Sequence, residues 1–284
     1  MTPLLSPAGL VTADLTLYWV TAVLYAAAAA SYVLRLVFGG DRWARWSARA
    51  TWAALVVNTV QLAVHWYRAG HAPYISRLEV VTSTVWLIVV LFLVVQRRTP
   101  ELAAAGAFLL PVATLALGFV GTAATPAVGA PPLSFATVWL GIHVVFTQLF
   151  VGCALLAAGL AFLGLTGLAA RPGAVAMRVP QGRAADDLIY RFTAAGFFFL
   201  TIMILAGSIW ANHAWGRYWG WDPIEVWSLI CWLIYALKLH LIRTFGWKGG
   251  RLAWLSLAAL GVALFSMFGV VLVYPSIHGS YMVK

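Results

Sequence analysis

The sequence predicts an all-α, polytopic integral membrane protein. Of its 284 residues, 63% are hydrophobic and only 9% are charged, and the mean hydropathy of +0.91 is typical of membrane proteins. Apolar segments long enough to cross a bilayer also recur along the whole chain. About eight transmembrane helices are expected, with boundaries accurate to a few residues: 17–38, 48–66, 79–95, 102–120, 135–165, 190–211, 223–243 and 252–273.

The first expected helix contains an alanine run, Ala26–Ala30, that permits close helix packing. Nothing in the 16 residues before it suggests a functional site. They contain neither a basic n-region nor a small-residue cleavage site, so no removable signal peptide is expected. The second expected helix is the most polar, because it contains Asn58, Gln61 and His65. We interpret His65 and the nearby His71 as solvated residues of the membrane interface.

Residues 121–134 form an uncharged loop rich in proline and glycine, which is too short for a domain and is interpreted as a lid or a spacer. In the helix that follows, His143 lies about 12 Å along the axis, at about 1.5 Å per residue. A histidine at membrane depth is a functional candidate, because an unpaired polar group in hydrocarbon is costly. The alternative is a hydrogen bond to a neighbouring helix.

A polar segment, 171–189, divides the chain into a front region, 1–170, and a rear region, 190–284. This segment combines proline, glycine and mixed charge, and we expect it to be a cytoplasmic loop. The sequence contains no P-loop, dinucleotide-binding fingerprint, zinc-protease motif or nucleophile elbow. Cys153 and Cys231 lie inside apolar segments without a C-x-x-C motif, so we interpret them as packing residues. Any thiol chemistry would then belong to a substrate or a partner.

The most distinctive stretch is the Trp-rich segment, residues 210–227, which reads WANHAWGRYWGWDPIEVW. Tryptophan supplies flat aromatic surface, Gly216 and Gly220 let backbone approach a ligand closely, and Asp222-Pro223 ends the run before a new helix. This surface suits a large planar apolar ligand. The alternative is an aromatic belt at the membrane interface, where tryptophan is enriched in membrane proteins generally.

The net charge of +10 is also seen in proteins that bind nucleic acid, but the basic residues here are distributed as in a membrane protein. They concentrate in alternate loops, and only Arg68, Arg77, Arg217 and Lys284 fall in the others. The positive-inside rule then places both termini and the Trp-rich segment on the outer side of the membrane. No nucleic-acid partner is expected.

The Trp-rich segment resembles the tryptophan-rich WWD signature of the haem-handling proteins of cytochrome c biogenesis. Within that group it is most similar to the CcsA (ResC) family. The similarity runs from Tyr190-Arg191-Phe192 through WDPIEVWSLICWLIYALKLH and Gly246-Trp247 to His278. It covers about the last third of the chain closely and the remainder loosely. Members of the family carry an acidic residue at the position of Glu79, so we expect Glu79 to orient the outer surface.

The resemblance implies a set of ligands for b-type haem, iron protoporphyrin IX. On the outer side, His143 and His278 would bind the iron as its two axial ligands. His213 is a rival ligand there. On the inner side, His240 lies about 22 Å along the helix from the Trp-rich segment, at about 1.5 Å per residue, and would bind haem as it enters.

The Trp-rich segment is expected to provide the remaining haem contacts: Trp215, Trp219, Trp221, Asp222 and Trp227. Asp222 is also expected to cap the seventh helix together with Glu225, which follows three residues later. The alternative for these two carboxylates is a general acid/base pair. The haem propionates would take Arg217, indole N–H groups and backbone amides as donors.

The function that the resemblance implies is haem transport across a bacterial cytoplasmic or thylakoid-type membrane. Haem would then be presented to an apocytochrome c C-x-x-C-H segment for thioether attachment. The chain would be one part of a holocytochrome c synthase (haem lyase), with a CcsB/ResB-like membrane subunit and with thiol-reducing proteins as partners. It would contribute orientation rather than a catalytic residue of its own.

Two alternatives remain open at this stage. A HemX-like structural or regulatory subunit would hold haem without attaching it to a protein. A haem lyase of the CcmF or CcmC type fits less well, because the chain is much shorter than the first and ends differently from the second.

Overall fold

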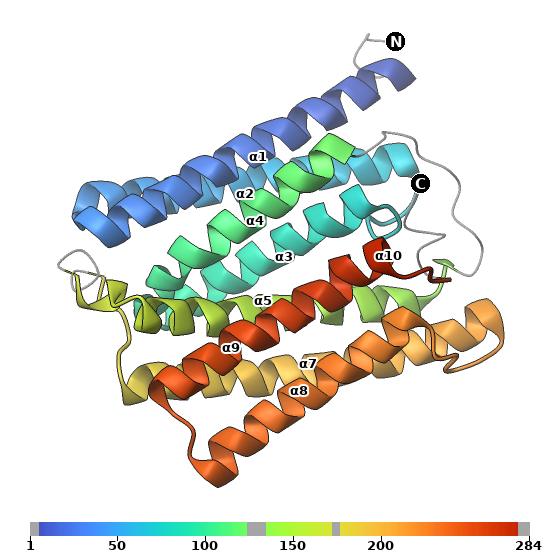
Figure 1. Ribbon diagram of the computed structural model, residues 1–284. Helices are drawn as coiled ribbons and strands as arrows, with labels where there is room; N and C mark the ends of the chain where they lie inside the picture. The colour runs from blue at the N-terminus through green and yellow to red at the C-terminus, as the bar shows by residue number, and fades with distance from the viewer. Residues whose placement is uncertain (1–5, 124–134, 172–176, 278–284) are drawn as a thin grey trace.

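The computed structural model describes residues 6–123, 135–171 and 177–277, and these ranges contain helices and no strand (Figure 1). The all-α prediction is therefore confirmed. The α-helices are α1 (Pro7–Phe38), α2 (Asp41–Ala69), α3 (Arg77–Arg98), α4 (Gly106–Ala123), α5 (Val138–Leu165), α7 (Arg183–Trp215), α8 (Pro223–Phe245), α9 (Gly249–Leu264) and α10 (Val270–Val273). Short helices of other types are η2 (Pro100–Ala105), η4 (Leu168–Ala170) and the π-helix η5 (Phe265–Gly269), which joins α9 to α10.

Seven of the described helical segments are long and apolar enough to cross a membrane. α2 forms where the sequence predicts a helix but is too polar to meet that criterion. Its polar side chains face α1, where the Tyr25 hydroxyl donates to Asn58 Oδ1 at 3.2 Å and Gln61 Nε2 donates to Asp14 Oδ1 at 2.8 Å. Asn58 and Gln61 are thus buried against α1 instead of being exposed to lipid, although Asn58 Nδ2 and Gln61 Oε1 have no hydrogen-bond partner among the described residues.

Three helices, α1, α2 and α7, begin at least seven residues earlier in the chain than the hydropathy pattern predicts. α1 begins at Pro7, where the Ser6 hydroxyl accepts a hydrogen bond from the Gly9 N–H at 3.1 Å. Serine before a proline is a typical start of a helix. α7 begins at Arg183, inside the expected cytoplasmic loop. The extra turns of α2 and α7 are rich in charged residues, so a search for apolar residues does not detect them.

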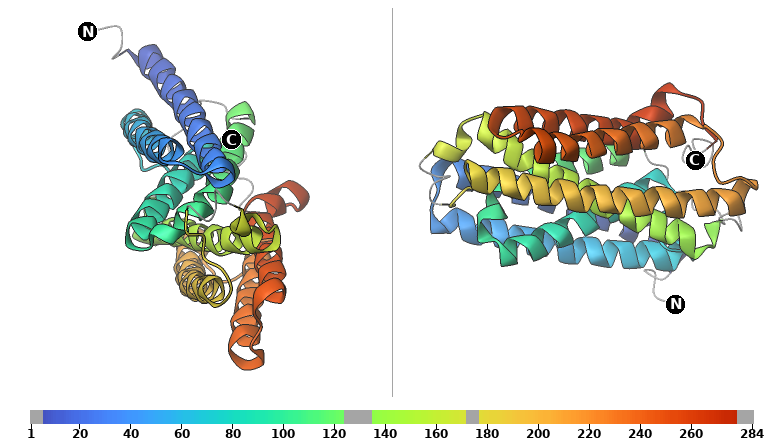
Figure 2. Two further views of the ribbon diagram at one scale, coloured as in Figure 1. Left: turned by 90° about the vertical axis from the view of Figure 1, so that its left-hand side faces the viewer. Right: turned by 90° about the horizontal axis from the view of Figure 1, so that it is seen from below.

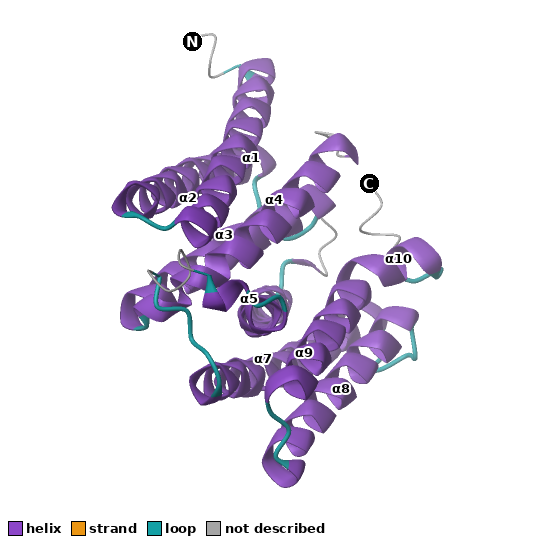
Figure 3. Cartoon of the chain, turned by 60° about the vertical axis from the view of Figure 1, so that its left-hand side comes forward, coloured by secondary structure: helices purple, strands orange, loops and turns teal. Residues whose placement is uncertain are grey.

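α5 lies at the centre of the bundle, between a group formed by α1–α4 and a group formed by α7–α9 (Figures 2 and 3). Small residues such as Ala154, Ala158 and Gly159 are buried along α5 and let its neighbours approach closely. In the most apolar window of α5, 72% of the residues are buried inside the protein, compared with 22% for α8. α8 is therefore an edge helix.

The turn between α7 and α8 lies at the same end of the bundle as the start of α1, the start of α5 and the end of α10 (Figure 1). We call this the Trp-rich end. The start of α3 and the ends of α2 and α4 also belong to it, because successive helices alternate in direction. The helices at this end enclose the candidate site.

Candidate functional site

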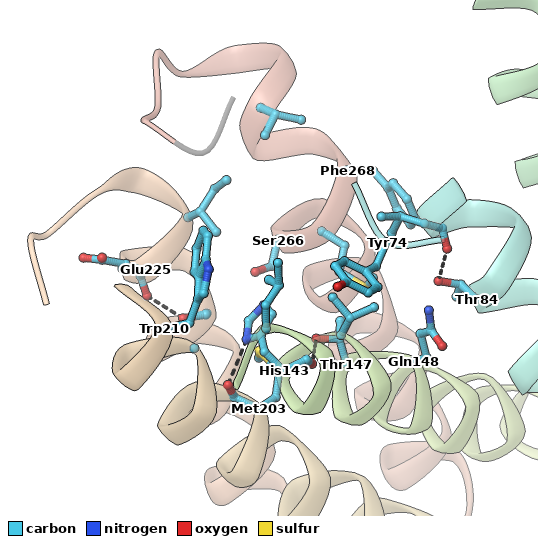
Figure 4. A pocket seen from close by; sticks show the side chains of 18 of the residues that line it. Tyr74, Thr84, His143, Thr147, Gln148, Met203, Trp210, Glu225, Ser266 and Phe268 are labelled. Atoms are coloured by element: carbon cyan, nitrogen blue, oxygen red, sulfur yellow. Dashed lines mark hydrogen bonds between the residues drawn. The ribbon is translucent and has the colours of Figure 1, made fainter. Parts of the chain in front are cut away.

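A cavity of about 230 Å³ lies at the Trp-rich end. Its wall is built from α3, α4, α5, α7, the start of α8 and the segment from η5 to α10 (Figure 4). The wall is mainly apolar, and its polar side chains include Arg77, His143, Gln148 and Glu225. Such a lining suits an apolar ligand that carries a few polar groups.

His143 lines this cavity from α5 (Figure 4). Its Nδ1 lies 2.9 Å from the backbone carbonyl oxygen of Met203 on α7. A carbonyl oxygen only accepts, so Nδ1 carries the proton and the lone pair of the neutral ring is on Nε2. The hydrogen bond to a neighbouring helix is thus present, and it is compatible with ligation because it uses the other nitrogen. This hydrogen bond orients the ring, as does the hydrogen bond that a metal-binding histidine usually donates from its other ring nitrogen.

Gly207 on α7 makes room for the His143 ring. A Cβ atom added at Gly207 would lie 2.6 Å from Nδ1 and 3.0 Å from Cε1 of His143. Side-chain carbons do not approach so closely, so a larger residue would have to displace the imidazole or α7. Nothing in the sequence marks Gly207, because a glycine within an apolar helix does not reveal what it contacts.

Trp219 and Trp221 occupy different environments, although both belong to the loop between α7 and α8. Trp219 lines the cavity. Trp221 is 71% exposed, and its ring meets that of Trp219 edge-on with 5.9 Å between the centroids. Trp221 also has a φ of 57°, a left-handed conformation that costs a bulky residue about 1–2 kcal/mol. Of these two rings, only that of Trp219 therefore faces the cavity.

The other tryptophans of the Trp-rich segment pack against protein. Trp215 lies edge-on to Trp210, with 4.9 Å between the ring centroids, and Trp210 itself lines the cavity. The ring centroids of Trp227 and of Phe265 in η5 lie 4.6 Å apart. His213 is exposed at the end of α7 and does not line the cavity. Sequence periodicity does not separate these roles, because the segment spans two helices and a loop.

Asp222 and Glu225 form the predicted cap of α8. The Asp222 carboxylate accepts a hydrogen bond from the Ile224 N–H at 3.1 Å, and Glu225 accepts one from the Asp222 N–H at 3.1 Å. Glu225 also accepts a hydrogen bond from the Gly220 N–H at 2.7 Å. The two carboxylates thereby hold the turn that carries Trp221.

Asp222 has a further role that the sequence does not predict. Its Oδ1 accepts a hydrogen bond from the Ser276 hydroxyl at 2.7 Å, and its Oδ2 accepts one from the Ile277 N–H at 2.9 Å. The chain that follows α10 is thus tied to the start of α8. The next residue, His278, lies outside the part of the chain that the structure describes.

His240 is far from the cavity, near the opposite end of α8. It is exposed, its Nδ1 lies 3.2 Å from the Thr244 hydroxyl oxygen, and its ring lies edge-on to Phe245 at 5.5 Å. Two residues earlier, Lys238 is buried, with its Nζ 5.8 Å from the centre of the Tyr235 ring. The structure therefore does not bring His240 together with His143.

A second polar cluster joins α1, α2 and α3 at the Trp-rich end. His65 is only 3% exposed, and its ring lies 2.7 Å from Asp14 Oδ2 and 3.1 Å from Glu79 Oε1. The Nε and Nη2 atoms of Arg68 donate to the same Asp14 oxygen at 3.1 and 2.9 Å. The interpretation of His65 as a solvated residue is therefore wrong. Asp14 also shows that a buried cluster begins within the first 16 residues, where the sequence suggests none.

This cluster also holds the loop between α2 and α3. Glu79 Oε2 accepts a hydrogen bond from the Ile75 N–H at 2.9 Å. His71 is half-buried, with Nδ1 3.0 Å from the Ala72 carbonyl oxygen and 3.8 Å from Glu79 Oε2. Since Ile75 and Tyr74 both line the cavity, Glu79 orients one wall of the cavity through the backbone.

Comparison with known proteins places the chain in a family. The profile of the family described as "Cytochrome C assembly protein" matches residues 74–278. "Cytochrome c biogenesis protein CcsA" of Synechococcus sp. (strain RCC307) is 32% identical over 254 residues, which cover 80% of this chain and 81% of the relative. The chain belongs to the CcsA family. The CcsA protein of Parasynechococcus marenigrum (strain WH8102) is 32% identical over 256 residues, covering 79% of this chain and 83% of the relative.

Family membership and the seven apolar helical segments identify an integral membrane protein of cytochrome c biogenesis. The matched range begins at the cavity residue Tyr74 and ends at His278. The solved structure of "Cytochrome c Heme Lyase CcmF" has the same fold, with a TM-score of 0.68 and 17% sequence identity. The match covers all of this chain and 50% of that one, so the chain spans half the length of the heme lyase.

Proposed function

We propose that this CcsA-family protein carries haem b across the membrane and presents it to apocytochrome c at the Trp-rich end. The observation that carries the proposal is the position of His143. Its imidazole lines an apolar cavity that Trp219 also lines. The hydrogen bond to the Met203 carbonyl sets the tautomer of the imidazole. A porphyrin is large, planar and mostly apolar, and its iron takes imidazole ligands, so both the lining and the donor suit it.

His143 and His278 are the proposed axial ligands of the outer haem. The bonds from Ser276 and Ile277 to Asp222 support this pairing, because they hold the residues just before His278 at the start of α8. Glu225, which also belongs to the first turn of α8, lines the cavity. Two neutral imidazoles on opposite faces of a porphyrin keep the iron six-coordinate and low-spin.

The proposed reaction at the Trp-rich end adds two thiols to two vinyl groups. The sulfur of each cysteine in the C-x-x-C-H segment bonds to the vinyl carbon next to the ring, and the thiol hydrogen goes to the outer vinyl carbon. Because the S–H bond adds across the vinyl double bond, the step needs no external oxidant or reductant. It also requires no nucleophile from the protein. The chain contributes by holding the two reactants in position, which removes much of the entropic barrier. The histidine of the substrate then replaces one axial ligand.

His240 is the proposed ligand where haem enters from the cytoplasmic side. Its exposed position on the edge helix α8 supports sharing with a partner chain. The other histidines that the structure describes belong to the Trp-rich end, so a second inner ligand would come from a CcsB/ResB-like subunit. The distribution of basic residues supports this orientation, with the Trp-rich end on the outer side.

The proposal can be tested with the optical spectrum of the purified chain, with and without its partner. His143→Ala should abolish the low-spin spectrum of the outer haem, and added imidazole should restore it. His213→Ala is the matched control, because His213 is exposed and does not line the cavity. A wild-type spectrum in His143→Ala would contradict the proposed ligand.

Maturation of a reporter cytochrome c in cells separates presentation from mere binding. A chain that binds haem through His143 but does not support maturation in any partner background would be a HemX-like subunit. Loss of maturation in His143→Ala, with normal membrane insertion, supports presentation.

A further inference from the structure

We propose that Arg77 binds a carboxylate of the cavity ligand and makes the cavity selective for an anionic porphyrin. This inference rests on the proposed function, since it names the group that recognises the haem propionates. The sequence favours Arg217 for that role. The structure indicates a different arginine.

Arg77 is the one basic side chain among the described residues that line the cavity, apart from the imidazole of His143. It is half-buried. No hydrogen bond, ion pair or aromatic contact joins its guanidinium to another described residue. Half-burial of an unpaired guanidinium costs solvation free energy, and a carboxylate in the cavity would offset that cost with two charge-assisted hydrogen bonds.

The other two arginines of the Trp-rich end are already engaged. Arg68 donates to Asp14 Oδ2 through Nε and Nη2. Arg217 is exposed and folds back over its own loop, where its guanidinium packs against the α-carbon of Gly220. Neither lines the cavity. Arg77 is thus the arginine of this end that a ligand in the cavity would meet.

The acidic side chains described at this end also have their own donors. Asp14 and Glu79 lie on either side of the His65 ring, and Asp14 additionally accepts from Arg68. Asp222 and Glu225 accept backbone N–H groups in the cap of α8. Each of these acids already accepts hydrogen bonds from other groups of the protein, which leaves Arg77 as a positive charge that faces the cavity without a counter-charge among the described residues.

The backbone on both sides of Arg77 is held in place. Arg77 is the first residue of α3, and the preceding Ser76 caps the helix by accepting a hydrogen bond from the Glu79 N–H at 3.3 Å. Glu79 in turn accepts from the Ile75 N–H at 2.9 Å and contacts His65. The buried cluster of α1–α3 therefore fixes the segment that directs Arg77 to the cavity, which reduces the entropy lost when a carboxylate binds.

The experiment compares two probes, iron protoporphyrin IX and its dimethyl ester, in titrations of the purified full-length chain. The ester has the same ring and iron but no carboxylates. The wild-type chain should bind the free acid about tenfold more tightly than the ester, the effect of one hydrogen-bonded charge pair. Arg77→Gln should bind both probes equally, by losing affinity for the acid and keeping its affinity for the ester. Arg77→Lys should keep part of the preference, and Arg217→Gln should keep all of it.

The outcomes separate this inference from the proposed function. If Arg77→Gln retains the wild-type preference, or if it loses the ester as well as the acid, Arg77 does not recognise carboxylates. The low-spin spectrum of the bound ester reports ligation by His143 independently of carboxylates. If neither probe gives a spectrum that depends on His143, the proposed haem site itself is wrong. If both ligate normally but the preference follows Arg217, then only the assignment to Arg77 is overturned.

Discussion

Asp222 Oδ2 accepts a hydrogen bond at 2.9 Å from the backbone N–H of Ile277, which lies 55 positions later in the chain. Its other oxygen, Oδ1, accepts from the Ser276 hydroxyl and from the Ile224 N–H. One buried carboxylate therefore caps α8 and also holds the residues that precede His278. A substitution of Asp222 can therefore affect both the cap of α8 and the position of the segment after α10. Substitutions of its partners are needed to separate these two effects.

We expect Asp222→Asn to weaken the outer haem site while α8 stays folded. Asparagine is as good a helix cap as aspartate, but an amide has only one acceptor oxygen and cannot serve Ser276 and Ile277 together. The loss of a hydrogen bond to a charged group is worth about 1.5–3 kcal/mol, so haem affinity should fall at least tenfold. Added imidazole should recover the low-spin spectrum.

Two controls identify the cause of that loss. Ser276→Ala removes one bond to Asp222 without touching the cap, and Glu225→Gln alters the cap without touching the segment after α10. Ser276→Ala should resemble Asp222→Asn in its spectrum, and Glu225→Gln should not. The opposite pattern would mean that Asp222 acts only through α8.

Gly207→Ala should disturb the iron ligand without destabilising α7. The added methyl group would lie 2.6 Å from His143 Nδ1 and break its hydrogen bond to Met203. Alanine favours a helix over glycine by about 1 kcal/mol, which offsets the loss of a hydrogen bond worth about 1 kcal/mol, so the thermal stability of the chain should change little. The spectrum should shift from low-spin toward a five-coordinate form.

Gly261→Ala is the matched substitution for that test, because nothing lies within 4 Å of a Cβ atom at Gly261. It should leave the spectrum unchanged. An unaltered spectrum in Gly207→Ala would show that the His143 ring does not depend on this close approach.

Trp219→Ala and Trp221→Ala should differ in haem content. Trp219 lines the cavity, whereas Trp221 is largely exposed. Loss of an aromatic contact costs about 1 kcal/mol beyond the lost apolar area, so Trp219→Ala should lower haem occupancy several-fold without changing the axial ligands. Haem per mole of purified protein is the measurement. Equal losses in both variants would assign the two rings a common role.

His240→Ala should lower the amount of haem that reaches the Trp-rich end without changing the spectrum of the haem that arrives. The physical reason is distance, since His240 lies near the opposite end of α8 and contacts Thr244 and Phe245. The effect should require the partner subunit. A changed outer spectrum at normal haem content would instead indicate a single shared site.

The helices were the most predictable part of the structure, because bilayer-length apolar runs leave few alternatives to a helix. The cap of α8 was also predictable, since Asp222 and Glu225 have the spacing of a capping box. Both are local properties that a sequence displays directly. The polar face of α2 was partly visible, because Asn58, Gln61 and His65 interrupt an apolar run.

The contacts between distant residues could not be predicted. His65 and its partner Asp14 are 51 positions apart, and His143 and Met203 are 60 apart. No local pattern pairs residues over such separations, so His65 resembled an interface histidine and Gly207 resembled any helical glycine. The same limit explains why the five tryptophans of the Trp-rich segment could not be divided into those that face the cavity and those that pack elsewhere.

The central position of α5 and the edge position of α8 give the walls of the cavity unequal stiffness. A shift of α5 would break packing against helices on several sides, because most of its apolar window is buried, whereas a shift of α8 would break far less. The cavity can therefore widen by movement of α8 while the imidazole of His143 remains in place. If His143 binds haem iron as proposed, a bulky peptide could be admitted in this way without displacing that ligand.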